Sequence, residues 1–512
     1  MLIRTFGSAV HGVNAYTITI EVNVTPGTKY FLVGLPDNAI KESEQRIESA
    51  LKQHGYRMPR QKVVINMAPA DIRKEGSAYD LPIALGILAA SDQMFGEKLK
   101  DYIIMGELSL DGTLRPIKGV LPIAIQARKE GFKGFILPVQ NAQEAAIVNK
   151  LDVLGVENIR QAIDFFDGKA DISPLIINTR DLFENTVDQY QADFADVQGQ
   201  ENIKRALEIA AAGGHNVIMI GPPGAGKTML AKRLPSILPP LTMQEALETT
   251  KIHSVAGKLG VAASLLSTRP YRAPHHTISD VALVGGGGIP QPGEISLAHN
   301  GVLFMDELPE FKRTVLEVMR QPLEERHVTI SRAKLTIDFP SNFMLIASMN
   351  PCPCGYYNHP EKDCVCGPGM VQRYLNKVSG PLLDRIDLHV EVTPVTFDQM
   401  TETRRSETSA AIRERVVQAR QIQAERFKEF TDIHSNAMMP SQMVKDLCQI
   451  NSGGKALLKT AMERLGLSAR AYDRILKVSR TIADLSNSQE IKIEHLAEAI
   501  QYRSLDREGW AG

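Results

Sequence analysis

The sequence predicts an α/β protein of several domains that ends in a helical region. Strand-like runs alternate with helical patterns over residues 1–165, which is typical of an α/β domain. A short apolar run at 216–220 leads into a glycine-rich loop and then a helix, so the loop is predicted to lie between a buried strand and a helix of an α/β core. From about residue 397 onward helical spacing dominates, and 512 residues leave room for about three such domains.

The glycine-rich loop has the composition and setting of a phosphate-binding P-loop. Its backbone N–H groups can close around phosphates, and the helix that starts at Met229 adds positive potential. Lys227 is expected to reach the β- and γ-phosphates, and the Thr228 hydroxyl is expected to hold Mg²⁺. The sequence therefore predicts ATP and Mg²⁺ as cofactors, bound by Gly221, Pro222, Pro223, Gly224, Ala225, Gly226, Lys227 and Thr228.

Two further apolar runs deliver polar side chains to the same predicted edge of the sheet. The run 301–305 ends at Asp306 and Glu307, and the run 343–349 ends at Asn350. We expect Asp306 to support Mg²⁺ through water and Glu307 to orient and deprotonate the attacking water. The Asn350 carboxamide can hydrogen-bond that water or the γ-phosphate.

Four of the five cysteines follow Asn350 closely. Cys352, Cys354, Cys364 and Cys366 form two C-x-C pairs with Gly and Pro between them. Soft thiolates at this spacing can wrap one tetrahedral ion and favour Zn²⁺. Because C-x-x-C is the more usual spacing, reduced or redox-labile thiols are the alternative.

Bulk composition excludes few functions. The formal net charge is -1, so nucleic-acid binding would need a local concentration of Lys and Arg. A basic, apolar leader is lacking at Met1, and no long apolar run occurs, so we expect a cytoplasmic protein that does not engage a membrane.

Candidate nucleic-acid contacts lie in two places. Residues 327–339 read as a β-hairpin with Arg332 and Lys334 at its tip, which can grip phosphates in a pore or simply keep a turn soluble. Arg269 and Arg272 lie in a long stretch, 235–300, that is rich in Gly and Pro and reads as a functional or disordered loop.

The same long stretch contains His275 and His276. Adjacent side chains diverge, so we interpret the two histidines as hydrogen-bonding loop residues rather than metal ligands.

The composition suggests domain boundaries. The first domain spans 1–165, a polar, aperiodic linker spans 166–195, an ATP-binding core with inserts and the four-cysteine motif spans 196–396, and a helical domain spans 397–512.

The first domain resembles the Lon-protease-type fold of magnesium-chelatase-like proteins, on the motifs 74–82 and 112–119. The resemblance places the nucleophilic serine of Lon at Ala78 and its lysine at Leu121, neither of which can do that chemistry. Ser77 and Lys118 lie close in sequence and keep a protease reading open, but a non-catalytic domain used for assembly is favoured.

Across nearly its whole length the chain resembles the ComM/YifB family of magnesium-chelatase-like AAA+ ATPases. The resemblance rests on five motifs, at 221–228, 269–279, 292–311, 350–355 and 380–392. It implies a Lon-like N-terminal domain, an AAA+ core with inserts and a C-terminal helical lid. By position, Asn350 matches the sensor-1 residue, Arg385 an arginine finger given to a neighbouring subunit, and Arg470 the sensor-2 arginine of the lid.

The resemblance also implies function. A finger that acts in trans implies a ring, expected to be a homohexamer, and the family implies DNA branch migration by a helicase-like motor in recombination or natural transformation. The alternative is a protein-remodelling ATPase that acts on a protein client. Without that context, Arg385 and Arg470 read as ordinary surface salt-bridge residues.

Overall fold

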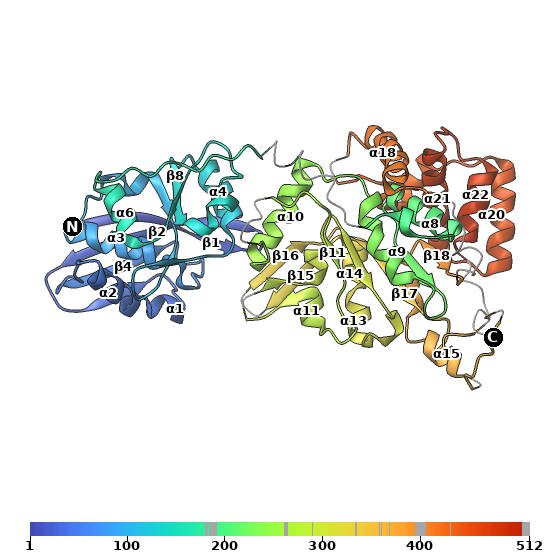
Figure 1. Cartoon of the computed structure of the whole chain (residues 1–512), viewed down its shortest axis with the longest axis horizontal. Helices are drawn as coiled ribbons and strands as arrows, with labels where there is room; N and C mark the ends of the chain where they lie inside the picture. The colour runs from blue at the N-terminus through green and yellow to red at the C-terminus, as the bar shows by residue number, and fades with distance from the viewer. Residues whose placement is uncertain are drawn as a thin grey trace. The chain divides into compact units, whose positions relative to one another are not determined.

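The computed structural model describes residues 1–179, 183, 192–260, 265–288, 290–332, 335–357, 359, 361–367, 369–394, 406–430 and 432–503 (Figure 1). The chain forms two compact units. Unit 1 comprises Met1–Val187 and Met243–Ser267, and unit 2 comprises Asp188–Thr242 and Thr268–Gly512. None of the described helices is both long enough and apolar enough to cross a membrane.

Unit 1 is built on a seven-stranded mixed sheet in the order β3-β4-β2-β1-β5-β8-β9. The strands are β1 (Leu2–His11), β2 (Asn14–Thr25), β3 (Tyr30–Val33), β4 (Lys62–Ala68), β5 (Tyr102–Ile104), β8 (Gly134–Pro138) and β9 (Asp152–Val156), with a small ribbon of β6 (Glu107–Leu108) and β7 (Leu114–Arg115). The helices are α1 (Asn38–Lys41), α2 (Ser43–Gln53), α3 (Asp80–Ala90), α4 (Val120–Lys129), α5 (Ala142–Ala145), α6 (Ile159–Phe166) and α10 (Met243–Ala256).

The core of unit 1 lies between the sheet and its helices. Every residue of α3 is buried, because this apolar helix packs against β1 and β2, and α4 packs against β2. The alternating pattern of β2 places Ile18, Ile20 and Val22 in the core, as expected for a strand with one buried face.

Unit 2 contains a five-stranded parallel sheet in the order β11-β14-β17-β10-β18. Its strands are β10 (Val217–Ile220), β11 (Tyr271–Arg272), β14 (Val302–Met305), β17 (Met344–Met349) and β18 (Leu388–Glu391). Two hairpins are added, β12 (Gly285–Gly286) with β13 (Gln291–Pro292) and β15 (His327–Arg332) with β16 (Leu335–Pro340). All residues of β10, β14 and β17 are buried, which is typical of a parallel sheet covered on both faces.

The helices of unit 2 divide into those of the sheet domain and those of the C-terminal bundle (Figure 1). The first group is α8 (Glu201–Gly213), α9 (Lys227–Arg233), α11 (Asp280–Val284), α12 (Glu294–Leu297), α13 (Arg313–Val318), α14 (Arg320–Glu325), α15 (Met370–Leu375) and α16 (Gly380–Leu383). The second is α18 (Ser409–Arg426), α19 (Ser441–Leu447), α20 (Ser452–Leu465), α21 (Ala469–Leu485) and α22 (Ile493–Gln501). Both α18 and α21 pack against α8, so the bundle and the sheet domain share one core. The α/β class and the C-terminal helices predicted from the sequence are confirmed.

The structure differs from the predicted boundaries at one insertion. The stretch 235–300, read as a long loop, contains α10, β11, α11, β12, β13 and α12. Residues 243–267 belong to unit 1 rather than to the ATP-binding core, because α10 packs against α4. The Ser254 hydroxyl donates a hydrogen bond of 2.5 Å to the buried carboxylate of Glu144, which also accepts one from the Leu121 N–H.

The predicted linker 166–195 is partly packed. The Leu175 N–H donates to the Val153 carbonyl at 2.9 Å, and Ile172 and Ile177 contact the core of unit 1. Residues 180–182 and 184–191 of the linker lie outside the described residues, as do 401–405 of the predicted first lid helix.

Candidate active site

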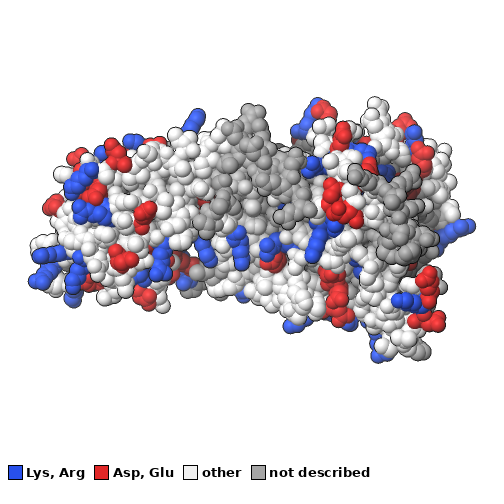
Figure 2. Space-filling view, in the orientation of Figure 1, with Lys and Arg blue, Asp and Glu red and all other residues white. Residues whose placement is uncertain are grey.

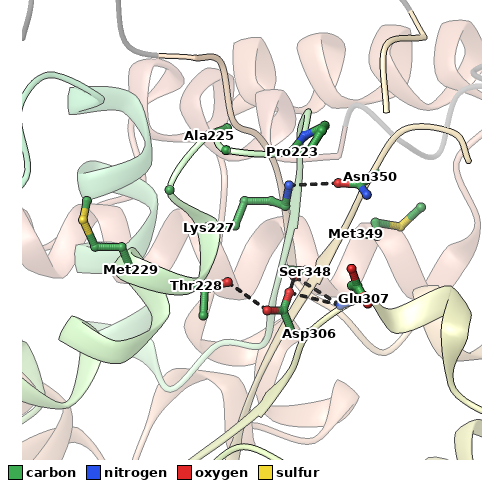
Figure 3. A pocket seen from close by; sticks show the side chains of 12 residues that line it. Pro223, Ala225, Lys227, Thr228, Met229, Asp306, Glu307, Ser348, Met349 and Asn350 are labelled. Carbon is green, nitrogen blue, oxygen red and sulfur yellow. Dashed lines mark hydrogen bonds between the residues drawn. The ribbon is translucent and has the colours of Figure 1, made fainter. Parts of the chain in front are cut away.

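The carboxyl ends of three adjacent strands bring the predicted ATP-site residues together (Figure 3). The P-loop follows β10, Asp306 and Glu307 follow β14, and Asn350 follows β17. These segments enclose a cavity of about 420 Å³, a size typical of small-molecule sites. The cavity is lined by Pro223, Gly224, Ala225, Gly226, Lys227, Thr228, Met229, Asp306, Glu307, Ser348, Met349 and Asn350.

The P-loop turns through residues with left-handed backbone. Gly224 and Gly226 have φ angles of 79° and 84°, which residues other than glycine rarely adopt. The turn aims Lys227 back across the loop, where Nζ donates to the carbonyls of Gly221 (2.7 Å) and Pro222 (2.9 Å) and to Asn350 Oδ1 (3.1 Å). Burial lowers the pKa of Lys227, although Asp306 and Glu307 oppose the shift.

Thr228 and Asp306 meet as a Mg²⁺ site requires. The Thr228 hydroxyl donates to Asp306 Oδ2 at 2.8 Å, so both oxygens can face the same cation. The Ser348 hydroxyl donates to the other oxygen of Asp306 and thereby fixes the carboxylate. Ser348 was missed by sequence reasoning, although it is the polar exception in the apolar run 343–349 and faces Asp306 because Met305 pairs with Ala347.

Glu307 has a strained backbone and an exposed carboxylate. Its φ and ψ are 54° and 51°, a conformation that costs free energy in a residue with a side chain and recurs at functional sites. The side chain is 55% exposed, and Glu307 Oε2 lies 3.8 Å from His276 Nδ1. His275 hydrogen-bonds Thr277 Oγ1 at 2.9 Å, as expected for a loop residue. The predicted divergence of the two side chains is wrong, because the ring centroids of His275 and His276 lie only 4.1 Å apart.

The two predicted arginines lie apart from the cavity of their own chain. Arg385 is buried between α16 and β18, where Nη2 lies 2.7 Å from Glu324 Oε1 and Nη1 donates to the Pro381 carbonyl at 2.5 Å. Arg470 is exposed in the first turn of α21. Neither residue is among those that line the cavity.

A buried polar network joins the helical bundle to the sheet. Asp387, two residues after Arg385, pairs with Arg474 of α21 and with His215 Nδ1 at 3.3 Å, while His215 Nε2 hydrogen-bonds Thr481 at 2.8 Å. Burial would raise the pKa of Asp387, but Arg474 and His215 hold it well below its usual range. The strand β18 is thus fixed to the bundle beside Arg385.

Two of the predicted DNA contacts are structural residues in this conformation. The Arg269 guanidinium donates to the carbonyls of Pro239 (2.6 Å), Asn300 (2.7 Å) and Pro240 (3.2 Å). Arg272 forms a bidentate pair with Glu294, at 2.6 and 2.7 Å. Both guanidinium groups are thus engaged within the protein in this conformation.

The predicted hairpin exists and carries Arg332 at the end of β15. Arg332 is exposed, and its guanidinium lies against Gly286 of the second hairpin. Ile330 likewise contacts Gly285, so the two hairpins pack together. Lys334 lies outside the described residues.

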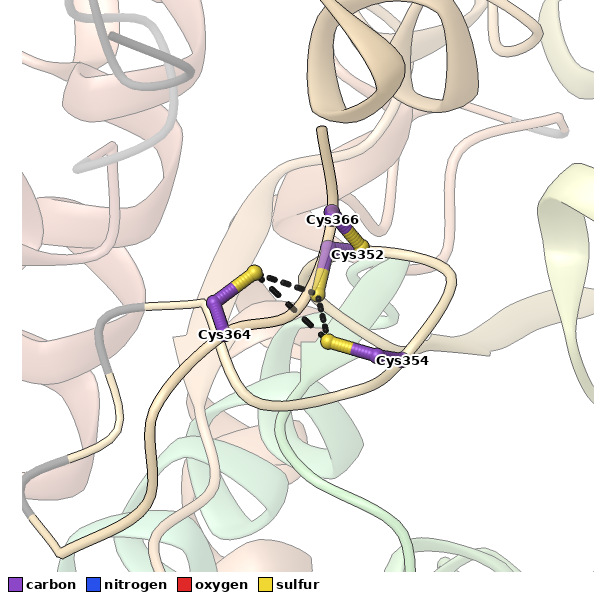
Figure 4. A group of neighbouring side chains, drawn as sticks. All are labelled: Cys352, Cys354, Cys364 and Cys366. Atoms are coloured by element: carbon purple, nitrogen blue, oxygen red, sulfur yellow. Dashed lines mark hydrogen bonds between the residues drawn. The ribbon is translucent and has the colours of Figure 1, made fainter. Parts of the chain in front are cut away.

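The four cysteines after Asn350 converge (Figure 4). Their sulfur atoms all lie within 4.8 Å of one another, and the closest are separated by 3.3 Å (Cys352–Cys354), 3.5 Å (Cys354–Cys364) and 3.7 Å (Cys352–Cys364). A tetrahedral ion with metal–sulfur bonds of about 2.3 Å requires sulfur separations of about 3.8 Å, so this donor set fits such an ion.

The pKa values of Cys354 and Cys366 are shifted in opposite directions. Burial opposes the shift at Cys354, yet hydrogen bonds from the Tyr356 N–H and the Cys352 thiol lower its pKa to about 6. Burial and the neighbouring thiols raise the pKa of Cys366 to about 12. A divalent cation would remove this conflict by binding all four as thiolates.

The first domain carries no serine–lysine dyad in its described residues. Ala78 and Leu121 occupy the positions that correspond to the Lon nucleophile and base, and Leu121 is fully buried. The Ser77 hydroxyl donates to Glu107, and the stem of Lys118 lies against Gly257. No hydrogen bond joins Ser77 to Lys118, so the geometry gives the protease reading no support.

Family models match most of the chain. The model described as magnesium chelatase, subunit ChlI, matches residues 193–400. A second model, subunit ChlI of Mg-chelatase, matches 20–141, and the C-terminal ChlI model matches 406–503.

Curated relatives agree with these models. The competence protein ComM of Haemophilus influenzae is 45% identical, with 98% of this chain and 97% of that protein covered. The protein YifB of Escherichia coli is 43% identical over 98% of this chain and 96% of its own length. Lon protease 2 of Bacillus subtilis is 34% identical over 27% of this chain and 26% of its own. With the ATP-site geometry above, these similarities show that the chain belongs to the ComM/YifB family of magnesium-chelatase-like AAA+ ATPases, which binds and hydrolyses ATP with Mg²⁺.

Proposed function

We propose that this protein is a ring-forming cytoplasmic motor, a homohexamer, that couples ATP hydrolysis to movement along DNA in branch migration during recombination or natural transformation. The observation that carries the proposal is the path of the chain from the ATP site to the hairpin. β16 leads through residues 341–343 directly into β17, in which Ser348 lines the cavity, and Asn350, which also lines it, follows the strand. A change in the nucleotide therefore has a short covalent route to the exposed Arg332.

The cavity residues supply the chemistry of hydrolysis. Lys227 would exchange its carbonyl partners for phosphate oxygens, and Thr228 with Asp306 would hold Mg²⁺, which neutralises phosphate charge when bound. Glu307 would take the proton of the attacking water, and Asn350 would orient that water. Arg385 would serve as the arginine finger at a neighbouring subunit's site in a ring, and Arg470 would act as the sensor-2 arginine of the lid.

DNA would be held by local contacts to its phosphates. The face shown in Figure 2 carries interspersed acidic and basic side chains rather than a broad basic field, which agrees with the net charge of -1. A motor needs sequence-independent contacts, whose affinity falls as salt rises. The candidates are Arg332 and Lys334.

A branch-migration assay tests this function. The protein is incubated with a mobile four-way DNA junction and ATP, and separated duplexes are measured. We expect migration that fails with Glu307→Gln and is reduced about tenfold by Arg332→Glu, but not by Arg464→Glu, which alters an exposed arginine of α20. Absence of migration by the wild type under conditions where it hydrolyses ATP would contradict the DNA motor.

A second candidate is remodelling of a protein client. The magnesium-chelatase 67 kDa subunit of Heliobacterium mobile is 26% identical over 32% of this chain and 29% of its own length, and unit 1 offers a separate domain for a client. Stimulation of ATP turnover by a protein fraction but not by DNA would favour this alternative.

We also propose that the four cysteines bind one Zn²⁺. Four thiolates at near-tetrahedral separations match the preference of zinc, and Cys352 is fully buried as structural ligands are. Elemental analysis of the purified protein should find one zinc per chain. A metal-free protein with four reactive thiols would contradict this assignment.

A further inference from the structure

The four-cysteine loop begins inside the ATP site. Asn350 lines the cavity and accepts a hydrogen bond from Lys227 Nζ at 3.1 Å, and Cys352 follows two residues later in a fully buried position. The Tyr357 N–H donates to Cys352 Sγ at 3.3 Å, so the first thiol has a fixed orientation. A displacement of Cys352 would therefore be transmitted to Asn350 through a single intervening residue, Pro351.

The four-cysteine loop also packs against the P-loop. Gly355 has a φ of 86°, and a Cβ atom at this position would lie 2.5 Å from Pro223 Cδ. Real Cβ atoms do not approach this closely, so only glycine allows the turn after Cys354 to pack against Pro223. The second thiol thus adjoins a backbone contact with the phosphate-binding loop.

The C-terminal end of the four-cysteine loop also contacts Asn350. After Cys366 the chain forms α15, whose Tyr374 is buried and hydrogen-bonds the backbone of Asn350. Asn350 and Tyr374 therefore meet beside the cavity, with the four cysteines between them in the sequence. The four sulfurs are the loop's internal cross-link when a metal is bound.

From these contacts we propose that the four-thiolate site is a structural element of the ATP site: a soft divalent cation of the zinc class holds the loop against Pro223 and fixes Asn350, so that ATP turnover requires the bound metal. This inference rests on the ATP site and the thiolate metal site proposed above. Without the cation, the four converging sulfur atoms have no common partner, and the described residues of the loop show no other cross-link.

The test compares two ways of disturbing the loop in the full chain. Cys354→Ser removes one ligand, and Gly355→Ala leaves all four ligands but places a Cβ against Pro223. Gly367→Ala is the matched control, because its Cβ would meet only Met370 Sδ at an ordinary 3.7 Å and its φ lies outside the left-handed region. Cys448→Ser controls for loss of a buried cysteine outside the loop.

Zinc per chain, affinity for a fluorescent ATP analogue and basal ATP turnover without DNA are measured for each protein. We expect Cys354→Ser to lose zinc and about tenfold or more in turnover. Gly355→Ala should keep one zinc per chain and still lose about tenfold in turnover or ATP affinity, whereas Gly367→Ala and Cys448→Ser should match the wild type.

Two results would overturn the coupling. One is a zinc-free Cys354→Ser protein with wild-type affinity and turnover, and the other is a Gly355→Ala protein that behaves like Gly367→Ala. An active wild type without zinc would instead contradict the metal assignment itself. Since basal turnover is measured, these outcomes are independent of whether DNA is the substrate.

Discussion

The guanidinium of Arg385 is held within its own chain by the carboxylate of Glu324, at 2.7 Å. The side chain of Arg385 is 8% exposed and that of Glu324 is 47% exposed, so the ion pair joins a buried guanidinium to a carboxylate that reaches solvent. The Nε of Arg385 is buried and has no hydrogen-bond partner among the described residues. The contacts to Glu324 and to the Pro381 carbonyl hold the guanidinium in one orientation.

Arg385→Ala should abolish turnover while ATP still binds. An arginine finger contributes about 10³-fold or more to phosphoryl transfer. Loss of the buried Arg385 side chain and of its hydrogen bond to the Pro381 carbonyl should also lower stability by about 1–3 kcal/mol. Turnover, ATP affinity and thermal unfolding are measured, with Arg320→Ala on α14 as the control.

Mixing variants tests whether the finger acts in trans. Arg385→Ala chains keep a complete P-loop, and Lys227→Ala chains keep the finger, so mixed rings should recover turnover that neither variant shows alone. If the mixture stays as inactive as its components, Arg385 does not serve a neighbouring site.

Glu307→Gln should bind ATP without hydrolysing it. The amide cannot accept the proton of the attacking water, which should lower the turnover by about 10²–10⁴-fold. ATP affinity should stay near that of the wild type because Glu307 is exposed and Lys227 is untouched. Glu310→Gln, which alters an exposed residue paired with Lys377, is the control. Unchanged turnover in Glu307→Gln would refute the assignment of the base.

Ser348→Ala should weaken the apparent affinity for Mg²⁺ rather than ATP binding. The serine hydroxyl fixes Asp306 but does not itself need to touch the nucleotide, so the Mg²⁺ concentration for half-maximal turnover should rise about tenfold. Ser341→Ala removes another buried serine hydroxyl, before β17, and should leave that concentration unchanged. Equal Mg²⁺ titrations for the two variants would show that Ser348 has no such role.

The lowered pKa of Lys477 should make the free energy of unfolding depend on pH. Burial lowers its pKa to about 8, although Asp387 opposes the shift, so protonation costs the folded state about 3 kcal/mol at neutral pH. The unfolded chain binds the proton more strongly between about pH 8 and 10.5, and stability therefore rises with pH across this window.

Lys477→Met removes that cost. The lost hydrogen bond to the Ala437 carbonyl offsets about 1 kcal/mol, so the variant should be more stable by about 2 kcal/mol at pH 7, with the difference closing toward pH 9.5. Urea unfolding at both pH values checks this, with Lys459→Met on the exposed face of α20 as the control. A difference that does not change with pH would contradict the shifted pKa of Lys477.

The ATP site was predictable because each of its parts is local in sequence. A buried strand followed by Gly224, Gly226 and Lys227, or by Asp306 and Glu307, specifies both the element and the end of the sheet at which it terminates. The spacing of the four cysteines likewise indicated their convergence.

Other features depend on distant partners and have no local signal. Helix α10 buries Thr249, Thr250, His253 and Ser254, so it shows no apolar stripe and its stretch reads as a loop. The burial of Arg385 depends on Glu324, and the engagement of Arg272 depends on Glu294, neither of which spacing reveals.

ATP turnover with and without DNA tests most directly whether this ATPase is a DNA motor. Turnover of the wild type is measured with no DNA, with single-stranded DNA and with a four-way junction across a salt series, and Glu307→Gln gives the background. For a DNA motor, we expect DNA to stimulate turnover strongly, and we expect this stimulation to decline as the salt concentration rises, because the contacts are to phosphates. Turnover that no DNA stimulates at any salt concentration, in a protein that hydrolyses ATP, would contradict the DNA motor and favour a protein client.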